Sequence, residues 1–352
     1  MDGYAIQAGK HDQLLTVIGE SLAGHPFQGD IGPEECVRIF TGALVPANAG
    51  QIILQEEVAE REGNQVRFNA HTPSESYIRP IGNDLKLGSQ IADQGDVLNP
   101  FLMGSLSSAG VSSVEVFRRP VIGVFSSGDE LRDPGVGVKD LLEGQIYDSN
   151  RLTVMQLLAT MPVEVRDLGR LADEANIVSE ALTNSAQVCD AMITSGGVSV
   201  GDADYISETI EKLGTLAFWR LNLKPGKPMA FGKIENCWIF GLPGNPVSTI
   251  VTALLLVRPA LATLAGTVSE PPLRIKAKLT TSLQHQPGRT EYQRGIFTQL
   301  SGEFVVGHTG DQGSNRLSTF HNANCLIEVD KTVGDLQSGD WVNIVPLTSL
   351  IN

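Results

Sequence analysis

Residues 120–128 read PVIGVFSSG, an apolar run that ends in a glycine turn. A second run of the same kind, VCDAMITSGG, occupies residues 188–197. The segments around them alternate between strand-like and helix-like patterns: RLTVMQLLAT (151–160), VEVRDLG (163–169), DEANIVSEALTNSA (173–186), ADYISETIEKLG (203–214), MAFGKI (229–234), WIFGLPG (238–244) and an apolar helix opened by Asn245 and Pro246. Such alternation predicts a doubly wound parallel sheet, so we expect an α/β domain over residues 119–268.

The flanking regions have a different character. Residues 1–85 contain short β-favouring runs between Gly, Pro and Asn turns and predict a β-rich domain. Residues 86–118 form a connector, in which Asn99 and Pro100 predict the start of a short helix closed by Gly110. Strand-like runs predict a small β-barrel over 271–352. The expected fold is therefore a multidomain α/β plus β protein.

Composition narrows the function. The 352 residues carry 26 Lys and Arg against 40 Asp and Glu, a formal net charge of −14, with no basic run, so nucleic acid is not expected as a partner. The four cysteines are widely spaced and indicate neither zinc nor disulfides. The N-terminus lacks a signal-peptide pattern, and the charge-free stretch 236–257 is broken by Pro and Gly. We expect a cytoplasmic protein without a membrane span.

Two loops of the α/β domain follow apolar strands and contain glycine and acids. Asp129 and Glu130 lie after the first strand, where they are suited to a cation or a ligand amine, or are simply solvated. Ser195, Gly196 and Gly197 begin the second loop and predict an anion-binding nest. Asp202 and Asp204 follow, either as helix caps or as ligands of a Mg²⁺ that offsets their repulsion of a phosphate.

A third loop reads LKPGKP (223–228). Lys224 and Lys227 each precede a proline, which favours an extended backbone and a fixed pair of cations suited to a small oxyanion. A solvated turn is the simpler alternative. The GLPGNP turn (241–246), with Asn245, adds a helix N-terminus at the same edge of the sheet.

Together these motifs resemble the molybdopterin molybdenumtransferase family, which includes MoeA and the E domain of gephyrin. The resemblance covers essentially the whole chain. It rests on these segments: MDGYA (1–5), RIFTGALVP (38–46), FSSGDEL (125–131), QIYDSN (145–150), TSGGVSVGDADY (194–205), LKPGKPMAFGK (223–233), GLPGNPVS (241–248), PGRTEYQRG (287–295) and GDQGSNRLSTF (310–320).

The resemblance implies the last step of molybdenum cofactor synthesis, in which adenylyl-molybdopterin and molybdate give molybdenum cofactor and AMP with Mg²⁺. It implies catalytic roles for Asp204, Asp2, Asp84, Lys224 and Lys227, with Asp202 and Asp204 as metal ligands. The substrate-binding residues that it implies are Thr41, Asp129, Glu130, Ser195, Gly196, Gly197, Ser199, Pro228, Asn245, Arg289 or Arg294, and Ser314. It also implies a homodimer, with enzymes of the molybdopterin pathway as further partners.

The chain departs from the family pattern in two places. Family members carry several dozen residues before MDGYA that belong to an elongated dimerising domain, so the segment 86–118 is expected to be a remnant of that domain and the dimer to be affected. Asn83 precedes Asp84 where the family often has Glu. The alternatives are a related enzyme, such as a molybdopterin adenylyltransferase or a nucleotide hydrolase, and a non-catalytic scaffold of the gephyrin kind.

Overall fold

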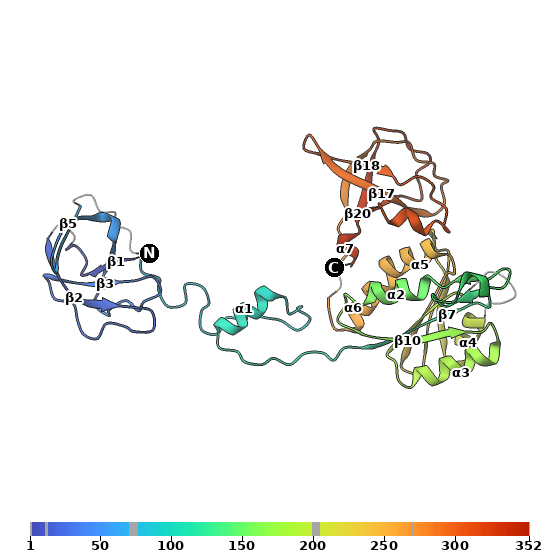
Figure 1. The fold of residues 1–352 in the computed structure, drawn as a ribbon, viewed down its shortest axis with the longest axis horizontal. Coiled ribbons are helices and arrows are strands. Elements are labelled where there is room, and N and C mark those ends of the chain that lie inside the picture. Colours follow the sequence, from blue (N-terminus) through green and yellow to red (C-terminus); the bar gives the residue numbers. More distant parts are fainter. Residues whose placement is uncertain (1, 11–12, 70–76, 199–204, 269, 352) are drawn as a thin grey trace. The chain divides into compact units, whose positions relative to one another are not determined.

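The computed structural model describes residues 2–10, 13–69, 77–198, 205–268 and 270–351. It separates into two compact units, Met1–Ile91 and Ala92–Asn352 (Figure 1). Each unit is described by itself below.

The amino-terminal unit is a six-stranded sheet in the order β4-β1-β3-β2-β6-β5. Its strands are β1 (Gly3–Ile6), β2 (Leu14–Ser21), β3 (Glu35–Ile39), β4 (Gln51–Leu54), β5 (Val58–Glu62) and β6 (Gln65–Phe68), with the 3₁₀ turn Gln55–Glu57 before β5. Apolar clusters lie on both faces of the sheet, one around Tyr4 and Phe68 and one around Ile31 and Val37. The β-rich character expected for this region is confirmed.

The second unit begins with an extended connector that contains helix α1 (Pro100–Ser108). The Asn99 side chain accepts hydrogen bonds from the backbone N–H groups of Phe101 (3.0 Å) and Leu102 (2.9 Å), and Pro100 occupies the first turn. Gly110 follows the helix with a φ of +81°. The helix predicted from Asn99, Pro100 and Gly110 is therefore confirmed.

The α/β domain of this unit contains a six-stranded sheet in the order β10-β7-β11-β15-β14-β12. The strands are β7 (Val121–Ser127), β10 (Glu164–Leu171), β11 (Ala191–Ser195), β12 (Thr215–Arg220), β14 (Pro228–Ile234) and β15 (Cys237–Leu242). β10, β7, β11 and β15 are parallel, whereas β14 runs antiparallel to both of its neighbours, β15 and β12. The expected all-parallel sheet is thus mixed, because only Glu235 and Asn236 join β14 to β15 and a two-residue loop permits only a hairpin.

Helices cover both faces of this sheet (Figure 1). α3 (Ala175–Ala186) and α4 (Tyr205–Leu213) pack on one face, and α2 (Asn150–Leu158) packs on the other beside the helical run 246–264. That run consists of α5 (Pro246–Thr252), a π-helical turn (Ala253–Val257) and α6 (Arg258–Leu264). By length and composition alone it would cross a membrane, but 61% of it is buried, as in the core helix of a folded domain.

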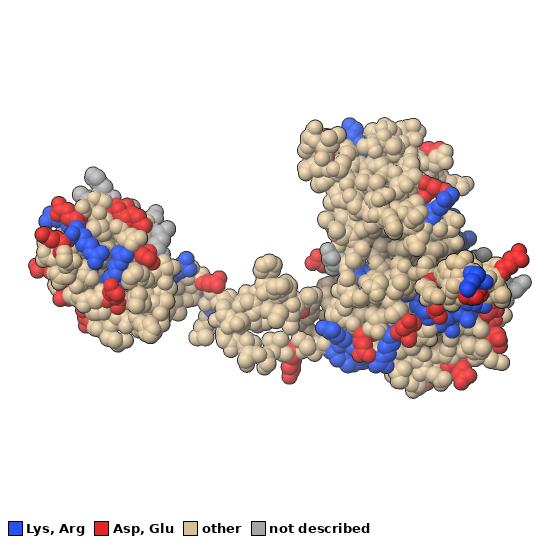
Figure 2. Space-filling view, in the orientation of Figure 1, with Lys and Arg blue, Asp and Glu red and all other residues tan. Residues whose placement is uncertain are grey.

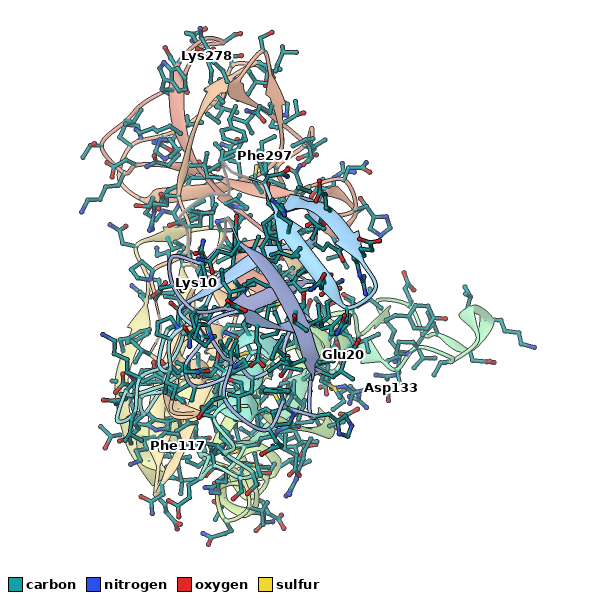
Figure 3. The ribbon with its side chains drawn as sticks, turned by 90° about the vertical axis from the view of Figure 1, so that its left-hand side faces the viewer. Lys10, Glu20, Phe117, Asp133, Lys278 and Phe297 are labelled. Atoms are coloured by element: carbon teal, nitrogen blue, oxygen red, sulfur yellow. The ribbon has the colours of Figure 1, made fainter. Side chains whose placement is uncertain are left out.

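A smaller segment projects from the domain after β7. It holds the two-stranded pair β8 (Leu131–Arg132) and β9 (Ile146–Tyr147), with the 3₁₀ turn Val138–Asp140 between them. Asp133, labelled in Figure 3, lies at its base and forms an ion pair with Arg151 of α2. The segment is thereby held to the same helix that begins at the sheet edge.

The carboxy-terminal part is a closed barrel. Its strands are β16 (Ile275–Leu279), β17 (Thr290–Leu300), β18 (Glu303–His308), β19 (Cys325–Val329) and β20 (Trp341–Pro346). The loop between β18 and β19 contains the 3₁₀ turn Leu317–Phe320, and α7 (Thr348–Ile351) follows β20. The order is β17-β18-β16-β20-β19, and pairing of β17 with β19 closes the barrel. The predicted barrel is confirmed, and a short strand, β13 (Leu223–Lys224), joins it from the α/β domain.

Candidate active site

The loops that follow β7, β11 and β15 meet at the carboxyl edge of the α/β sheet. The Asn150 side-chain amide donates to Ser195 Oγ (2.8 Å) and to the Gly244 carbonyl (2.7 Å), and the Gly196 N–H donates to the Leu242 carbonyl (3.1 Å). Ligands of open α/β sheets bind at this edge. The structure therefore brings together Ser195, Gly196 and the turn that contains Asn245.

The two glycines of this edge are required by its geometry. Gly196 and Gly197 have φ angles of +90° and +69°. A Cβ atom on Gly196 would lie 2.3 Å from the Ser127 carbonyl oxygen, and one on Gly197 would lie 2.8 Å from a side-chain carbon of Ile206. Only glycine fits both positions, and the bare backbone leaves room for a ligand to approach.

The acids after β7 are exposed. Asp129 Oδ1 accepts a hydrogen bond from the Asp173 N–H (3.3 Å), and Ser127 Oγ donates to the Asp173 carboxylate. The Glu130 carboxylate folds over Gly128. Within the described ranges, no three His, Cys, Asp or Glu side chains gather in a way that would hold a metal ion.

Three of the predicted site residues, Ser199, Asp202 and Asp204, lie outside the residues that the structure describes. The expected ligands of Mg²⁺ are among them. Asn245 occupies the N-cap of α5, and its side chain makes no capping hydrogen bond.

A cavity of about 810 Å³ lies where the KPGKP loop meets the barrel. Its polar lining comes from both parts of the unit: Lys224, Lys227, Ser248, Ser282, Gln284, Arg289, Glu291, Gln293, His308, Asp311, Gln312 and Ser314. Pro228, the first residue of β14, also lines it. The sequence analysis singled out Lys224, Lys227, Pro228, Arg289 and Ser314, so the structure gathers five separately predicted residues around one cavity.

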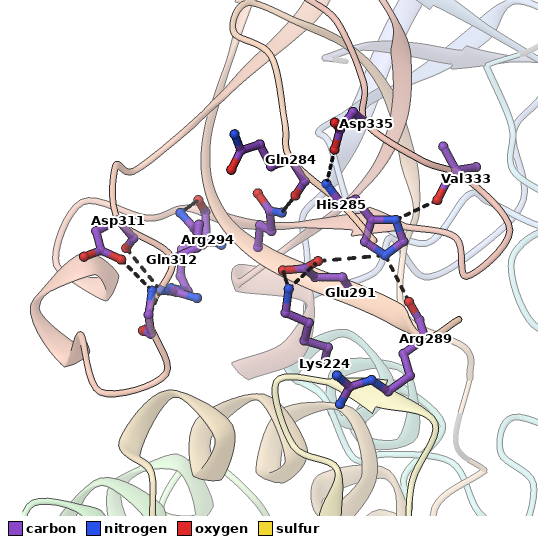
Figure 4. Close-up of polar contacts among 12 residues, drawn as sticks. Lys224, Gln284, His285, Arg289, Glu291, Arg294, Asp311, Gln312, Val333 and Asp335 are labelled. Carbon is purple, nitrogen blue, oxygen red and sulfur yellow. Dashed lines mark hydrogen bonds and ion pairs between the residues drawn. The ribbon is translucent and has the colours of Figure 1, made fainter. Parts of the chain in front are cut away.

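The cations of this cavity, which we call the oxyanion pocket, are not equivalent. Lys224 Nζ forms an ion pair with Glu291, 3.0 Å from Oε1 (Figure 4). Lys227 is exposed and Arg289 is half-buried. The two lysines predicted to form a fixed cationic pair therefore differ: Lys224 is paired with Glu291, Lys227 is exposed, and Arg289 of the barrel adds a third cation.

Arg294 has a different environment from Arg289. Its side chain is 1% exposed, and its guanidinium donates to Thr319 Oγ1 (3.0 Å) and to the carbonyls of Asp311 (3.3 Å) and Gly313 (3.1 Å). Burial lowers the pKa of this guanidinium, and the nearby Asp311 and Glu291 carboxylates oppose that shift. Arg294 thus holds the 309–320 loop, whose Gln312 and Ser314 line the oxyanion pocket, while Arg289 lines the pocket directly.

The remaining predicted residues belong to the amino-terminal unit. Asp2 Oδ1 accepts hydrogen bonds from the Thr41 N–H (2.9 Å) and the Thr41 hydroxyl (3.1 Å). These bonds, the backbone one first, lower the pKa of the Asp2 carboxyl. Asp84 is exposed in a turn of the same unit.

Charged side chains are intermixed on the surface of the amino-terminal unit that Figure 2 shows. The formal net charge of the protein is −14, so its overall charge repels anions. The oxyanion pocket departs from this balance locally, because its lining holds three cations, Lys224, Lys227 and Arg289, against two carboxylates, Glu291 and Asp311.

Family models match all three parts of the chain. Residues 1–110 match the MoeA N-terminal region (domain I and II), residues 123–263 a probable molybdopterin binding domain, and residues 276–347 the MoeA C-terminal region (domain IV). A molybdopterin molybdenumtransferase from Haemophilus influenzae is 41% identical over 100% of this chain and 87% of its own length. The chain belongs to the molybdopterin molybdenumtransferase family.

Other similarities agree with this membership. Gephyrin from Dictyostelium discoideum is 30% identical over 100% of this chain and 56% of its own length. The crystal structure of the molybdopterin biosynthesis MoeA protein from Pyrococcus horikoshii is 28% identical, covers 98% of this chain and 86% of its own, and has a TM-score of 0.80. The resemblance, the fold class and the prediction of an enzyme of molybdenum cofactor biosynthesis are confirmed, and the alternatives are not favoured.

Sequence reasoning missed several residues of the oxyanion pocket. Glu291 and Gln312 lie inside the motifs PGRTEYQRG and GDQGSNRLSTF, but neither was singled out. The position of Glu291 follows from the pairing of β13 with β17, which joins segments 67 residues apart, whereas Gln312 is held by a hydrogen bond from the Arg294 N–H to its Oε1 (2.8 Å). The burial pattern along β17 gives no simple alternation that would have marked Glu291, because residues 291–295 are all buried.

Proposed function

We propose that this protein catalyses the insertion of molybdate into adenylyl-molybdopterin, giving molybdenum cofactor and AMP. The observation that carries the proposal is the oxyanion pocket, in which Lys227 and Arg289 present positive charge beside the loops of the α/β domain. Molybdate is a small tetrahedral dianion, and lysine and arginine donors form strong, charge-assisted hydrogen bonds to oxyanions.

We assign the two substrates to different regions. The carboxyl edge of the sheet, with Ser195, Gly196 and Gly197, would receive the pterin and its phosphates, supported by Asn245, Asp129, Glu130 and the undescribed Ser199. Backbone N–H groups at such a glycine turn are suited to phosphate oxygens. The oxyanion pocket, with Lys224, Lys227, Pro228, Arg289 and Ser314, would receive molybdate.

The pocket residues would act through charge and position. Lys227 and Arg289 would neutralise the molybdate dianion and so reduce its repulsion from the phosphates of the second substrate. Arg294 would fix the loop that carries Ser314. Asp2, Thr41 and Asp84 stay assigned to the site on the resemblance alone.

The family resemblance also implies Mg²⁺, and the described residues do not supply a site for it. They include no group of three ligating side chains, and Asp202 and Asp204 are not described. We therefore assign no step to the metal.

Asp204 stays the proposed catalytic residue of this edge. Asp204→Asn keeps the size of the side chain but loses its charge, so it should lower cofactor formation nearly as much as Asp204→Ala. If Asp204→Asn kept nearly wild-type activity, the role of Asp204 would be that of a helix cap.

We also propose a homodimer. Helix α1 buries none of its side chains, and Phe101 and Met103 are 86% and 57% exposed. Such apolar exposure is unfavourable in water unless another surface covers it. We propose that a second copy of this chain covers the exposed side chains of α1. We also propose that the protein lies in the cytoplasm with the enzymes of its pathway. Phe101→Ser should shift the sedimentation coefficient of the protein toward that of a monomer. If the wild type sediments as a dimer and Phe101→Ser sediments in the same way, α1 does not lie in the interface.

The proposed chemistry is tested by titrating sodium molybdate into the purified protein and by following AMP release from adenylyl-molybdopterin. We expect saturable molybdate binding and AMP release that depends on molybdate. A protein that binds no molybdate at millimolar concentration would contradict the assignment of the oxyanion pocket.

A further inference from the structure

The oxyanion pocket contains a buried carboxylate. Glu291 on β17 is 4% exposed, and both of its oxygens lie close to Lys224 Nζ, Oε1 at 3.0 Å and Oε2 at 3.1 Å (Figure 4). Lys224 itself is about half exposed, with 47% of its side chain accessible. A carboxylate is an unexpected neighbour for an anion, so its presence requires an explanation.

The register of the sheet places this pair. β13 runs parallel to β17, with Leu223 opposite Thr290 and Lys224 opposite Glu291. The proline after Lys224 favours the extended backbone that such pairing needs. Lys224 and Glu291 therefore meet as cross-strand neighbours in a fixed register, unlike two long side chains that meet by chance on a surface.

His285 closes the other side of Glu291. Its imidazole is 1% exposed and lies 3.8 Å from Glu291 Oε2. The two ring nitrogens lie 2.8 Å from the Val333 carbonyl oxygen and 3.0 Å from the Arg289 carbonyl oxygen. His285 thus borders Glu291 and, through the contact of its Nε2 with the Arg289 carbonyl oxygen, lies against the backbone of the pocket's arginine.

In this arrangement Glu291 and an oxyanion compete for the same cation, Lys224. A buried carboxylate depends on its partner, because removing the partner leaves an uncompensated charge in a poorly solvated site. A dianion that enters the pocket is attracted by Lys224 and repelled by Glu291. While Lys224 is paired with Glu291, the pair contributes almost no net charge, and Lys227 and Arg289 remain to attract the anion.

We propose that Glu291 sets the affinity of the oxyanion pocket, as an internal counter-ion that holds Lys224 until a dianion displaces it. The proposal rests on the oxyanion-binding function proposed above. It assigns Glu291 the task of weakening the binding of oxyanions, so that a bound one is held loosely enough to be passed to the second substrate. Lys224 then contributes to binding only after it leaves Glu291.

The test is calorimetric titration of sodium molybdate into the full chain and its variants. Glu291→Gln keeps the shape of the side chain and frees Lys224, so molybdate should bind at least about tenfold tighter, the value of one charge-assisted hydrogen bond. Lys224→Met/Glu291→Gln removes both charges of a pair that contributes almost no net charge, so it should bind molybdate about as tightly as the wild type and at least about tenfold more weakly than Glu291→Gln; equal affinity of this double variant and Glu291→Gln would overturn the role of the freed Lys224.

The matched control is Glu303→Gln. Glu303 is exposed on β18 of the same barrel, outside the pocket lining, and its substitution changes the net charge by the same amount. Its molybdate affinity should equal that of the wild type. Lys224→Met alone supplies a second measurement: it leaves Glu291 unpaired in the pocket, so binding should weaken by at least about tenfold.

The outcomes separate this proposal from the function on which it rests. If the wild type binds molybdate and Glu291→Gln binds it equally well or more weakly, the counter-ion role is overturned and the pocket assignment stands. Equal tightening in Glu303→Gln also overturns it, because the effect would then be one of net charge. Binding by Glu291→Gln alone supports the proposal. Binding by neither protein overturns the pocket assignment and this role together.

Discussion

Gly196 shows how one residue type is required at the sheet edge. Its φ is +90°, and a Cβ atom would lie 2.3 Å from the Ser127 carbonyl oxygen. We expect Gly196→Ala to lower the free energy of unfolding by about 2–4 kcal/mol, because backbone strain and a steric clash add. Chemical denaturation measures the change.

Gly135 provides the control for that substitution. Its φ is +107°, but nothing lies within 4 Å of the position that a Cβ atom would take. Gly135→Ala should therefore show the backbone strain alone, about 1–2 kcal/mol. Equal losses in the two variants would mean that the contact with Ser127 is relieved by a small shift and does not require glycine.

Lys227 and Arg289 are expected to carry most of the attraction for molybdate. Lys227→Ala and Arg289→Ala should each weaken molybdate binding by about ten- to hundredfold, since each removes charge-assisted hydrogen bonds. Nucleotide affinity should change much less. Lys278→Ala is the control, because Lys278 is exposed on β16 and does not line the pocket. Unchanged molybdate affinity in both pocket variants would remove their assigned role.

The Asp2–Thr41 contact predicts a pH effect in the amino-terminal unit. The hydrogen bonds from Thr41 lower the folded-state pKa of Asp2 below its ordinary value of 3.8. Their stabilisation is therefore present above that pH and is lost as the pH falls through the lowered folded value. Thr41→Val removes only the hydroxyl bond, so it should raise the pKa of Asp2 part of the way in an NMR titration. An unchanged pKa would show that the backbone bond alone causes the shift.

Among the structural elements, the 309–320 loop depends most on one side chain. Arg294→Met would remove the guanidinium donor of the Asp311 carbonyl and one of the two donors of the Gly313 carbonyl, which keeps the Arg316 N–H (3.1 Å), and we expect a loss of about 2–4 kcal/mol in unfolding free energy. Arg289→Met should leave stability nearly unchanged and weaken molybdate binding. Thermal unfolding and titration of both variants separate the two arginines. A stable Arg294→Met protein with normal affinity would contradict the positioning role.

Local sequence signals predicted most of the elements correctly. Asn99 and Pro100 marked the start of α1, and apolar runs between turns marked all five strands of the closed barrel. The sequence analysis overlooked β12 (Thr215–Arg220), although Gly214 ends the preceding helix and apolar residues follow it. The direction of β14 was also missed, because the two-residue connection to β15 was not used to exclude a parallel pairing.

The site was predictable only in part, for a physical reason. Residue types and local conformation indicate that Lys224 and Lys227 are extended cations, and that Gly196 and Gly197 leave space. They do not indicate which residue lies opposite Lys224, because that depends on the register between β13 and β17. The Lys224–Glu291 ion pair and the burial of Arg294 both arise from such long-range contacts.

At the scale of the whole molecule, the second unit alone holds both the glycine edge and the oxyanion pocket. β13 links the α/β domain to the barrel, and the Val247 N–H donates to the Ser314 carbonyl (3.0 Å), which ties the start of α5 to the 309–320 loop. The two proposed substrate regions are thus built into one compact body. The central claim is that molybdate enters the pocket of this body and is transferred to the adenylylated pterin.

One measurement tests that claim most directly: AMP release from adenylyl-molybdopterin as a function of molybdate concentration, in the wild type and in Lys227→Ala/Arg289→Ala. We predict that the wild type releases AMP only with molybdate and that the double variant needs at least about a hundredfold more molybdate for the same rate. AMP release that is independent of molybdate, or an identical molybdate dependence in the two proteins, would contradict the account.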